Sequence, residues 1–169
     1  NNSGLFIDTS SPTNTAEWDI DGVNGIDFTF SIGGIYTSSS NAYVKILGSG
    51  SGANKFFDTP FNSDDVISGT NKVSQLNFVE YRISTTYIPS TTVTNITKTG
   101  VGDNQFFGFE FFKNGDSFIG WADISLAAPG LLNTSLTINR WCFDSGNTAI
   151  KADNCNVGTV AVPEPPIAS

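Results

Sequence analysis

The chain of 169 residues contains no histidine and no methionine. The absence of histidine excludes catalysis by Ser-His-Asp or Cys-His groups and excludes any His-ligated zinc or copper site. Charged residues make up only 14% of the chain, below the usual quarter, and the formal net charge is −8. Nucleic acids and anionic membranes both favour lysine and arginine, so neither is expected as a partner.

Long apolar segments are also missing. No stretch approaches the roughly 20 apolar residues that a membrane helix needs, and no signal peptide is visible. A sequence that starts at Asn1 without a methionine is typical of a processed mature chain. The length predicts one domain with a substantial core, to which 14 phenylalanines and three tryptophans contribute.

The most informative stretch is the segment 103–126, in which two apolar runs flank Asn114-Gly115. An Asn-Gly pair between alternating segments is the strongest short-range signal of a β-hairpin. This turn sets Phe109 opposite Gly120 on one face and Trp121 opposite Gly108 on the other. Both faces are partly apolar, so we expect both to be covered. The predicted core positions are Phe107, Phe109, Phe111, Phe118 and Ile124.

The second face of this hairpin leaves two interpretations open. It would contact either the opposite sheet of a sandwich or a neighbouring subunit. Its apolar members are Phe106, Phe112, Ile119 and Trp121.

Short strands separated by turn signals every ten or so residues predict an all-β fold. We expect an antiparallel, jelly-roll-like β-sandwich in a single domain with short extended terminal arms. Residues 1–15 form the N-terminal arm, residues 16–156 the sandwich and residues 157–169 the C-terminal tail. The arm contains Leu5, Phe6 and Ile7, which form either a first strand or a free strand for donation to a partner.

Two polar segments raise more specific questions. Asp19, Asp21 and Asp27 stand at relative positions 1, 3 and 9, which calcium loops use because Ca²⁺ prefers several oxygen ligands from a tight turn. Two positions depart from the calcium-loop pattern, because the fifth is Val23 and the place of the expected glycine is taken by Asn24. The alternative interpretation is that the aspartates form the solvent side of a hairpin. No other cofactor is expected. The sequence GSGSGAN at 48–54 predicts a flexible linker.

The two cysteines, Cys142 and Cys155, predict a disulfide in an extracellular setting. The alternative is a pair of free buried thiols. In the chain-entropy model, closing a loop of this size stabilises the fold by about 3 kcal/mol.

The C-terminal tail carries a resemblance to a known family. Val162, Pro163, Glu164 and Pro165 resemble the Val-Pro-Glu-Pro signature of bacterial PEP-CTERM proteins, although the hydrophobic segment and basic tail that normally follow are missing. The segments 19–30 and 106–122 are similar to the early strand pair and the aromatic hairpin of many members. The resemblance implies export, residence at the cell surface or in the extracellular matrix, transient membrane contact through a removed C-terminal segment, and no catalytic activity.

These observations favour a non-enzymatic extracellular structural protein, a surface, biofilm-matrix or filament subunit. The expected partners are further copies of the chain, joined by β-strand addition through the terminal arms, or matrix polysaccharide. The alternative is a secreted carbohydrate-binding module that uses exposed aromatic residues. The candidates for that role are Trp18, Tyr36, Tyr43, Tyr87 and Trp141.

An enzyme is the third hypothesis. Glu80 and Glu110 would supply the carboxylate pair of a glycosidase. Glu110 has apolar neighbours in the hairpin, and burial there would raise its pKa. A sheet-face glutamate capped by solvent or arginine is the commoner case.

Overall fold

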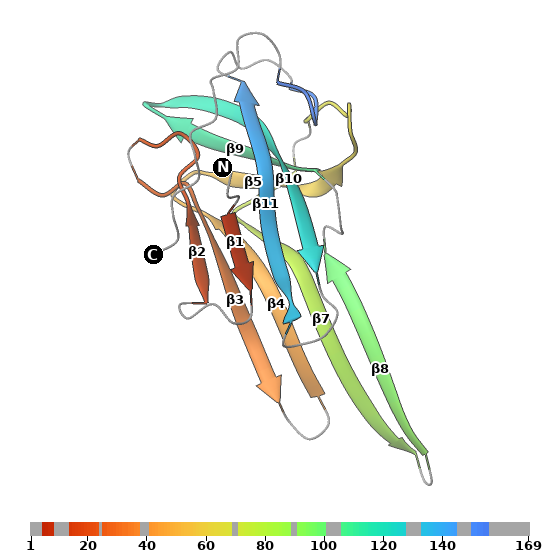
Figure 1. Cartoon of the computed structure of the whole chain (residues 1–169). Helices are drawn as coiled ribbons and strands as arrows, with labels where there is room; N and C mark the ends of the chain where they lie inside the picture. The colour runs from red at the N-terminus through yellow and green to blue at the C-terminus, as the bar shows by residue number, and fades with distance from the viewer. Residues whose placement is uncertain are drawn as a thin grey trace.

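The computed structural model describes residues 5–8, 14–23, 25–37, 41–68, 71–88, 91–100, 106–127, 133–144 and 150–155. Within these residues the chain is all β, in two antiparallel sheets that pack face to face (Figure 1). The prediction of a β-sandwich is confirmed. The strands are β1 (Leu5–Asp8), β2 (Thr15–Trp18), β3 (Phe28–Thr37), β4 (Asn41–Gly50), β5 (Lys55–Phe61), β6 (Lys72–Val73), β7 (Gln75–Ile88), β8 (Thr91–Gly100), β9 (Phe106–Lys113), β10 (Asp116–Ala127) and β11 (Ser135–Asp144).

The strand order brings distant parts of the chain together. One sheet has the order β1-β11-β10-β9-β5-β6, and the other has the order β2-β3-β4-β7-β8. The chain crosses between the sheets from β1 to β2, from β4 to β5, from β6 to β7 and from β8 to β9. As a result, strands from both ends of the described chain lie side by side at one edge, where β1 pairs with β11.

The hairpin of β9 and β10 has the predicted register. Asn114 and Gly115 both have positive φ, 53° and 89°, as the tight turn requires. Phe109 lies opposite Gly120, and Gly108 lies opposite Trp121. A Cβ at Gly120 would lie 2.5 Å from the Cys142 carbonyl oxygen and would also overlap the Phe109 ring. A Cβ at Gly108 would meet Phe57, Phe61 and Ile67 instead of Trp121, so both glycines make room for rings.

The main core lies between the two sheets and is dominated by aromatic side chains. Trp18 is fully buried at its centre, and its ring packs edge-on against Phe107, Phe109 and Trp141 with centroids 5.2 to 6.2 Å apart. Such pairs add about 0.5–1.5 kcal/mol each beyond the area that they bury. The predicted core positions Phe107, Phe109, Phe111 and Ile124 are fully buried, and Phe118 is partly buried against the same cluster.

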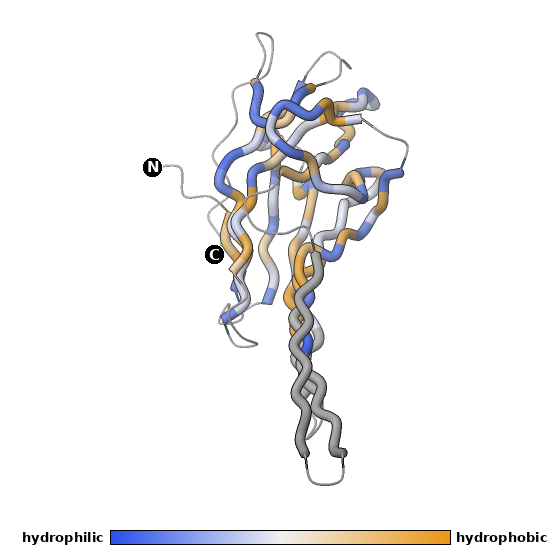
Figure 2. Tube along the Cα trace, turned by 90° about the vertical axis from the view of Figure 1, so that its right-hand side faces the viewer, coloured by the Kyte–Doolittle hydropathy of each residue, from blue (hydrophilic) through white to orange (hydrophobic). Residues whose placement is uncertain are grey.

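A second apolar cluster covers the other face of the β9–β10 hairpin. We call it the outer cluster; it consists of Phe57, Phe61, Ile67, Phe106, Trp121, Cys142, Ile150 and Ala152, with Ile119 packed against it. Phe57 and Phe61 belong to β5, and Ile67, Ile150 and Ala152 come from the segments that follow β5 and β11. In Figure 2 the apolar stretches recur along the strands of the body, whereas hydrophilic stretches concentrate in the loops at the top of the view.

The terminal arms are described only in part. Leu5–Asp8 forms β1, so this piece of the predicted N-terminal arm belongs to the six-stranded sheet of its own chain. The C-terminal tail, including Val162–Pro165, lies outside the described residues. No helix in the described part of the chain is long and apolar enough to cross a membrane.

Candidate functional site

The three aspartates named from the sequence converge in the loop between β2 and β3. One carboxylate oxygen from each of Asp19, Asp21 and Asp27 lies within 4.8 Å of the others. The loop folds this way because its own backbone satisfies the carboxylates. Asp19 accepts a hydrogen bond from the Gly22 N–H at 2.8 Å, and Asp21 accepts one from the Val23 N–H at 2.8 Å.

Asp27 is the most buried of the three, with only 8% of the residue exposed. The pKa of its carboxyl is raised to about 6, chiefly by burial and also by the nearby charges of Asp21 and Asp19. Hydrogen bonds from the Ile20 N–H at 2.8 Å and the Asn54 side chain oppose this effect. Near neutral pH this carboxyl is therefore close to its own titration range.

Asn54 ties this acidic loop to two other elements. Its side-chain amide donates to the Asp27 carbonyl at 3.1 Å and to the Asp27 carboxylate at 3.2 Å. Its carbonyl oxygen accepts from the Phe112 N–H at 3.0 Å, at the end of β9. The prediction of a flexible linker at 48–54 is wrong, because Gly48–Gly50 end β4 and the buried Asn54 anchors the turn that follows.

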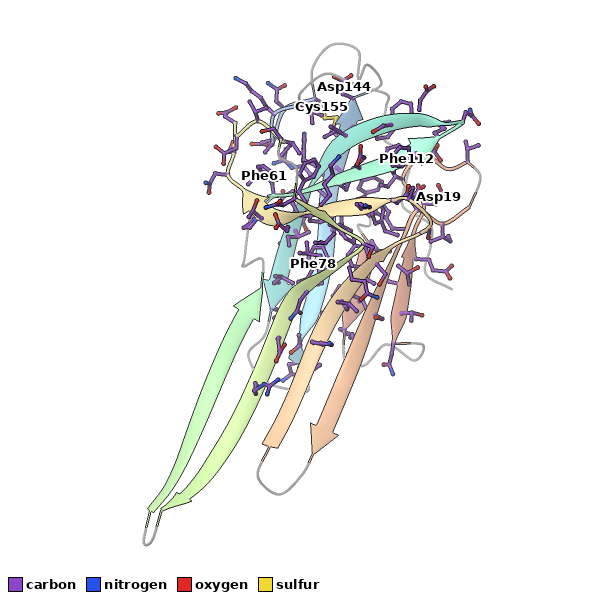
Figure 3. All side chains as sticks on the ribbon, turned by 180° about the vertical axis from the view of Figure 1, so that it is seen from behind. Asp19, Phe61, Phe78, Phe112, Asp144 and Cys155 are labelled. Carbon is purple, nitrogen blue, oxygen red and sulfur yellow. A yellow bond between two sulfur atoms is a disulfide. The ribbon has the colours of Figure 1, made fainter. Side chains whose placement is uncertain are left out.

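A lysine side chain supplies a positive charge beside the acidic loop. The Lys113 ammonium lies 3.0 Å from an Asp21 carboxylate oxygen, and Figure 3 shows Asp19 and Phe112 at the same end of the molecule. A pocket of about 310 Å³ adjoins Asp21, Asp27 and Lys113. The carboxylates are hydrogen-bonded within the loop, but the interpretation that they form the solvent side of a hairpin is wrong for Asp27, which is buried. Calcium binding by them stays a prediction.

The outer cluster is fastened by a covalent bond and a charged network. Cys142 and Cys155 form the predicted disulfide, with their Cα atoms 5.9 Å apart. Arg140 lies over the rings of Phe106 and Trp121, with its guanidinium carbon 5.9 and 5.5 Å from their centroids.

The same guanidinium joins two parts of the chain. Arg140 bonds Asp123 at 3.1 Å and Asp153 at 2.5 Å. Although burial lowers the pKa of Arg140, its hydrogen bonds with Asp123 and Asp153 more than offset this and leave the pKa above its ordinary value. The Trp121 indole N–H donates to the Asn154 carbonyl at 3.1 Å. These contacts hold segment 150–155 against the outer face of β10.

This cover corrects part of the predicted interface. Phe106 and Trp121 are 8% and 2% exposed, because the chain's own segments lie over them. Neither an opposite sheet nor a neighbouring subunit is needed there. Phe112 remains 41% exposed at the tip of the hairpin, and Ile119 is partly buried.

The N-terminal candidates are divided by the alternation of the strand. Leu5 and Ile7 point into the core and are 2% and 0% exposed, while Phe6 faces outward and is 49% exposed. Leu5 lies opposite Ile138, and Ile7 lies opposite Leu136. The strand therefore fills an apolar slot beside β11 with two side chains.

The exposure of the aromatic candidates for glycan binding is known for the tryptophans. The three tryptophans, Trp18, Trp121 and Trp141, are 0%, 2% and 4% exposed, so none presents a ring to a sugar. The side chains of Tyr36, Tyr43 and Tyr87 lie outside the described residues.

The two glutamates lie on different sheets, and each has its own cation. Glu110 bonds Lys72 and Ser117, each at 2.6 Å. Burial pushes the pKa of Glu110 upward, but these hydrogen bonds outweigh it and leave the pKa below its ordinary value. Glu110 is therefore a capped sheet-face glutamate, the commoner of the two cases considered from the sequence, with lysine in place of arginine. The hydrogen bond from Arg82 lowers the pKa of Glu80.

Comparisons with protein-family models, with curated proteins and with solved structures give no match. The functional argument consequently rests on the residues and the fold of this chain.

Proposed function

We propose that this chain is a non-enzymatic extracellular structural protein, a surface, biofilm-matrix or filament subunit that assembles by β-strand addition through its N-terminal strand. The observation that carries the proposal is the position of β1. It is an edge strand of four residues, and two of its side chains complete the core next to β11.

A strand of this kind can be exchanged between copies. Because β1 stands at the N-terminal end of the sandwich, it can leave the slot beside β11 without unthreading another strand. The same strand from a second copy would place the same Leu5 and Ile7 against Leu136 and Ile138. If each copy donates to the next without reciprocating, the contact propagates as a filament. Phe6, at 49% exposure, adds an apolar side chain to the outside of this joint.

Two further observations support an extracellular setting. A disulfide persists in oxidising compartments and is rare in reducing ones. The resemblance of Val162–Pro165 and of the aromatic hairpin to PEP-CTERM proteins points the same way.

The test is a pair of cysteines that traps β1 in its slot. Phe6 and Thr137 are direct cross-strand neighbours, so Phe6→Cys/Thr137→Cys brings two thiols within disulfide distance. The assembled protein is oxidised and run on a non-reducing denaturing gel. A strand donated between copies gives a ladder of covalently linked chains, and microscopy of the same sample shows filaments.

A matched control carries the same number of added thiols. Phe112→Cys/Thr137→Cys uses another exposed phenylalanine, which pairs with Ser117 and lies far from β11 Thr137 in the register. It should give no ladder. Purely intrachain bonds in the first variant, together with an absence of filaments, would reject strand addition by β1.

A further inference from the structure

The edges of the two sheets differ greatly in length. Three of the four edge strands are short: β1 and β2 have four residues each, and β6 has two. The fourth, β8, has ten residues, and no strand among the described residues pairs with its outer side. Natural sheets usually keep exposed edges short, charged or interrupted by proline. Strand β8 contains no proline and a single charged residue, Lys98.

The outer half of this hairpin also lacks a third strand. β7 pairs with β4 only as far as Ser84, which lies opposite Asn41. Beyond that point, Thr85–Ile88 pairs with Thr91–Thr94 of β8 and with no other strand in the described ranges. Figure 1 shows this hairpin projecting past the strands of the other sheet. A two-stranded ribbon is marginally stable in water, whereas a third strand makes it stable.

We propose that β8 pairs antiparallel with β8 of a second copy, which joins the two five-stranded sheets into one. We infer a second copy as the partner because the outer backbone groups of β8 are matched by an extended strand of similar length. Within the described residues, the one open edge of that length is β8 itself. In the dimer the long edge of each copy is paired, and the described edges that stay unpaired are the short strands β1, β2 and β6.

Two-fold symmetry limits the register of this pairing. Neighbouring residues of a strand face opposite sides, so the symmetry axis must pass through a residue position. An axis at Asn95 or at Ile96 pairs nine residues of each strand. Nine residue pairs supply on the order of ten backbone hydrogen bonds, the number in a typical stable interface.

This register gives each projecting half the support that it lacks. Residues 91–94 of one copy lie against residues 96–99 of the other when the axis is at Asn95. The latter residues pair with the part of β7 that β4 supports. The outer half of each hairpin thus pairs with the part of the other copy's β8 that lies beside the β4-supported part of β7.

The charges of the edge permit this contact. Lys98 would lie opposite Thr92 of the second copy in one register and opposite Thr94 in the other. The two lysines stay apart in both, so no like charges meet in a chain whose net charge is −8.

The experiment uses protein in which β1 cannot exchange. The Phe6→Cys/Thr137→Cys protein is oxidised in dilute solution, and chains with an intrachain disulfide are separated from any covalently linked ladder. In these chains β1 is locked in its own slot, so association through β8 is measured independently of the proposed strand donation. In this locked background, sedimentation velocity over a range of concentrations should show a monomer–dimer equilibrium. A locked protein that stays monomeric would overturn the proposal while leaving strand donation untouched.

Charge variants then place the contact on β8. Thr94→Lys/Ile96→Lys makes three positive charges with Lys98, and Thr94→Glu/Ile96→Glu/Lys98→Glu makes three negative ones. Like charges oppose each other in both registers, so each variant alone should dissociate about tenfold more readily. An equimolar mixture of the two should restore the dimer.

A matched control adds two lysines elsewhere. Ala53→Lys/Thr59→Lys uses exposed positions outside β8 and should leave the dimer unchanged. Equal thermal unfolding of all variants shows that the fold is retained. A dimer that is insensitive to the β8 charges, or equally weakened by the control, would show that the contact is elsewhere.

Discussion

Two hairpins of this chain differ in how far other parts of the chain support them. The β9–β10 hairpin is covered on one face by the other sheet and on its other face by the outer cluster. The β7–β8 hairpin is supported by β4 at its base and projects at its tip (Figure 1). The first carries phenylalanine, tryptophan and glycine, while β8 carries five threonines among ten residues.

The difference shows that side chains decide whether a β-hairpin is fixed in the core or projects from it. Large rings and glycines interlock, so the first hairpin has a fixed place in the core. Threonine favours the extended strand, so the second hairpin keeps its strand form, and no strand of the described segments pairs with the outer edge of β8. The contrast predicts that substitutions in the two hairpins differ in stability and in assembly.

The largest effect is expected from truncating a ring of the buried hairpin. Phe109→Ala removes the contacts of Phe109 with Trp18 and Phe28 in the core and should lower the free energy of unfolding by about 3–5 kcal/mol. Thr94→Ala in β8 should cost less than about 1 kcal/mol. Urea unfolding of both variants measures the difference, and equal losses would contradict the comparison.

Removing the disulfide should uncover the outer face of the same hairpin. Cys142→Ser/Cys155→Ser is expected to lower the free energy of unfolding by about 3 kcal/mol. It should also expose the Trp121 indole that segment 150–155 covers, and quenching of tryptophan fluorescence by iodide would show this. Unchanged quenching in the folded variant would mean that the noncovalent contacts, including the Arg140–Asp153 pair and the backbone hydrogen bonds of residues 150 and 152, hold the cover without the disulfide.

The glycine–ring contact can be tested with one methyl group. Gly120→Ala places a Cβ against the Phe109 ring and the Cys142 carbonyl and should cost about 1–3 kcal/mol. Gly33→Ala is the matched control, because a Cβ at Gly33 meets nothing within 4 Å. Thermal unfolding should separate the two variants clearly.

The acidic loop that meets the tip of β9 should give a pH signature. Because the folded pKa of Asp27 is about 6, above the unfolded value near 3.8, its protonated form stabilises the fold. This contribution is complete below about pH 4 and is lost as the pH rises through 6, and it amounts to about 3 kcal/mol. The difference in unfolding free energy between wild type and Asp27→Asn, measured from pH 4 to pH 7, isolates it from the other carboxylates.

The smallest effect tests the calcium prediction. Ca²⁺ bound by Asp19, Asp21 and Asp27 would favour the ionised carboxyl, so at pH 7 it should raise the melting temperature of the wild type and not of Asp27→Asn. Mg²⁺ serves as the matched ion. A melting temperature that does not respond to Ca²⁺ or to a chelator leaves the aspartates as hairpin residues only.

The sequence predicted what short-range rules govern. The Asn114-Gly115 turn and the alternation around it set the register of β9 and β10, and the spacing of the cysteines indicated the disulfide. What it did not predict depends on contacts between distant segments. The covering of Trp121 by segment 150–155 and the pairing of Lys113 with Asp21 have no local pattern.

The same distinction explains two errors. The composition of 48–54 indicated a linker, although the anchoring of Asn54 depends on Asp27 and on the Phe112 N–H, which is 58 residues away in sequence. Asp27 was expected on the solvent side of a hairpin, but it is buried and bonded to Asn54, which is 27 residues away in sequence. The open edge of β8 likewise appears only when the order of the strands is known.

The pairing of β1 with β11 also sets the order in which the molecule can be completed. Leu5 is made long before its partner Ile138, because the two lie far apart in sequence. Contacts this distant in sequence form slowly. A newly made chain therefore has an interval in which β1 has been made and β11 is not yet in place. Under the proposed strand addition, β1 of a neighbouring chain competes for the slot during that interval. The rate of folding and the local concentration would then decide between a closed monomer and a linked chain.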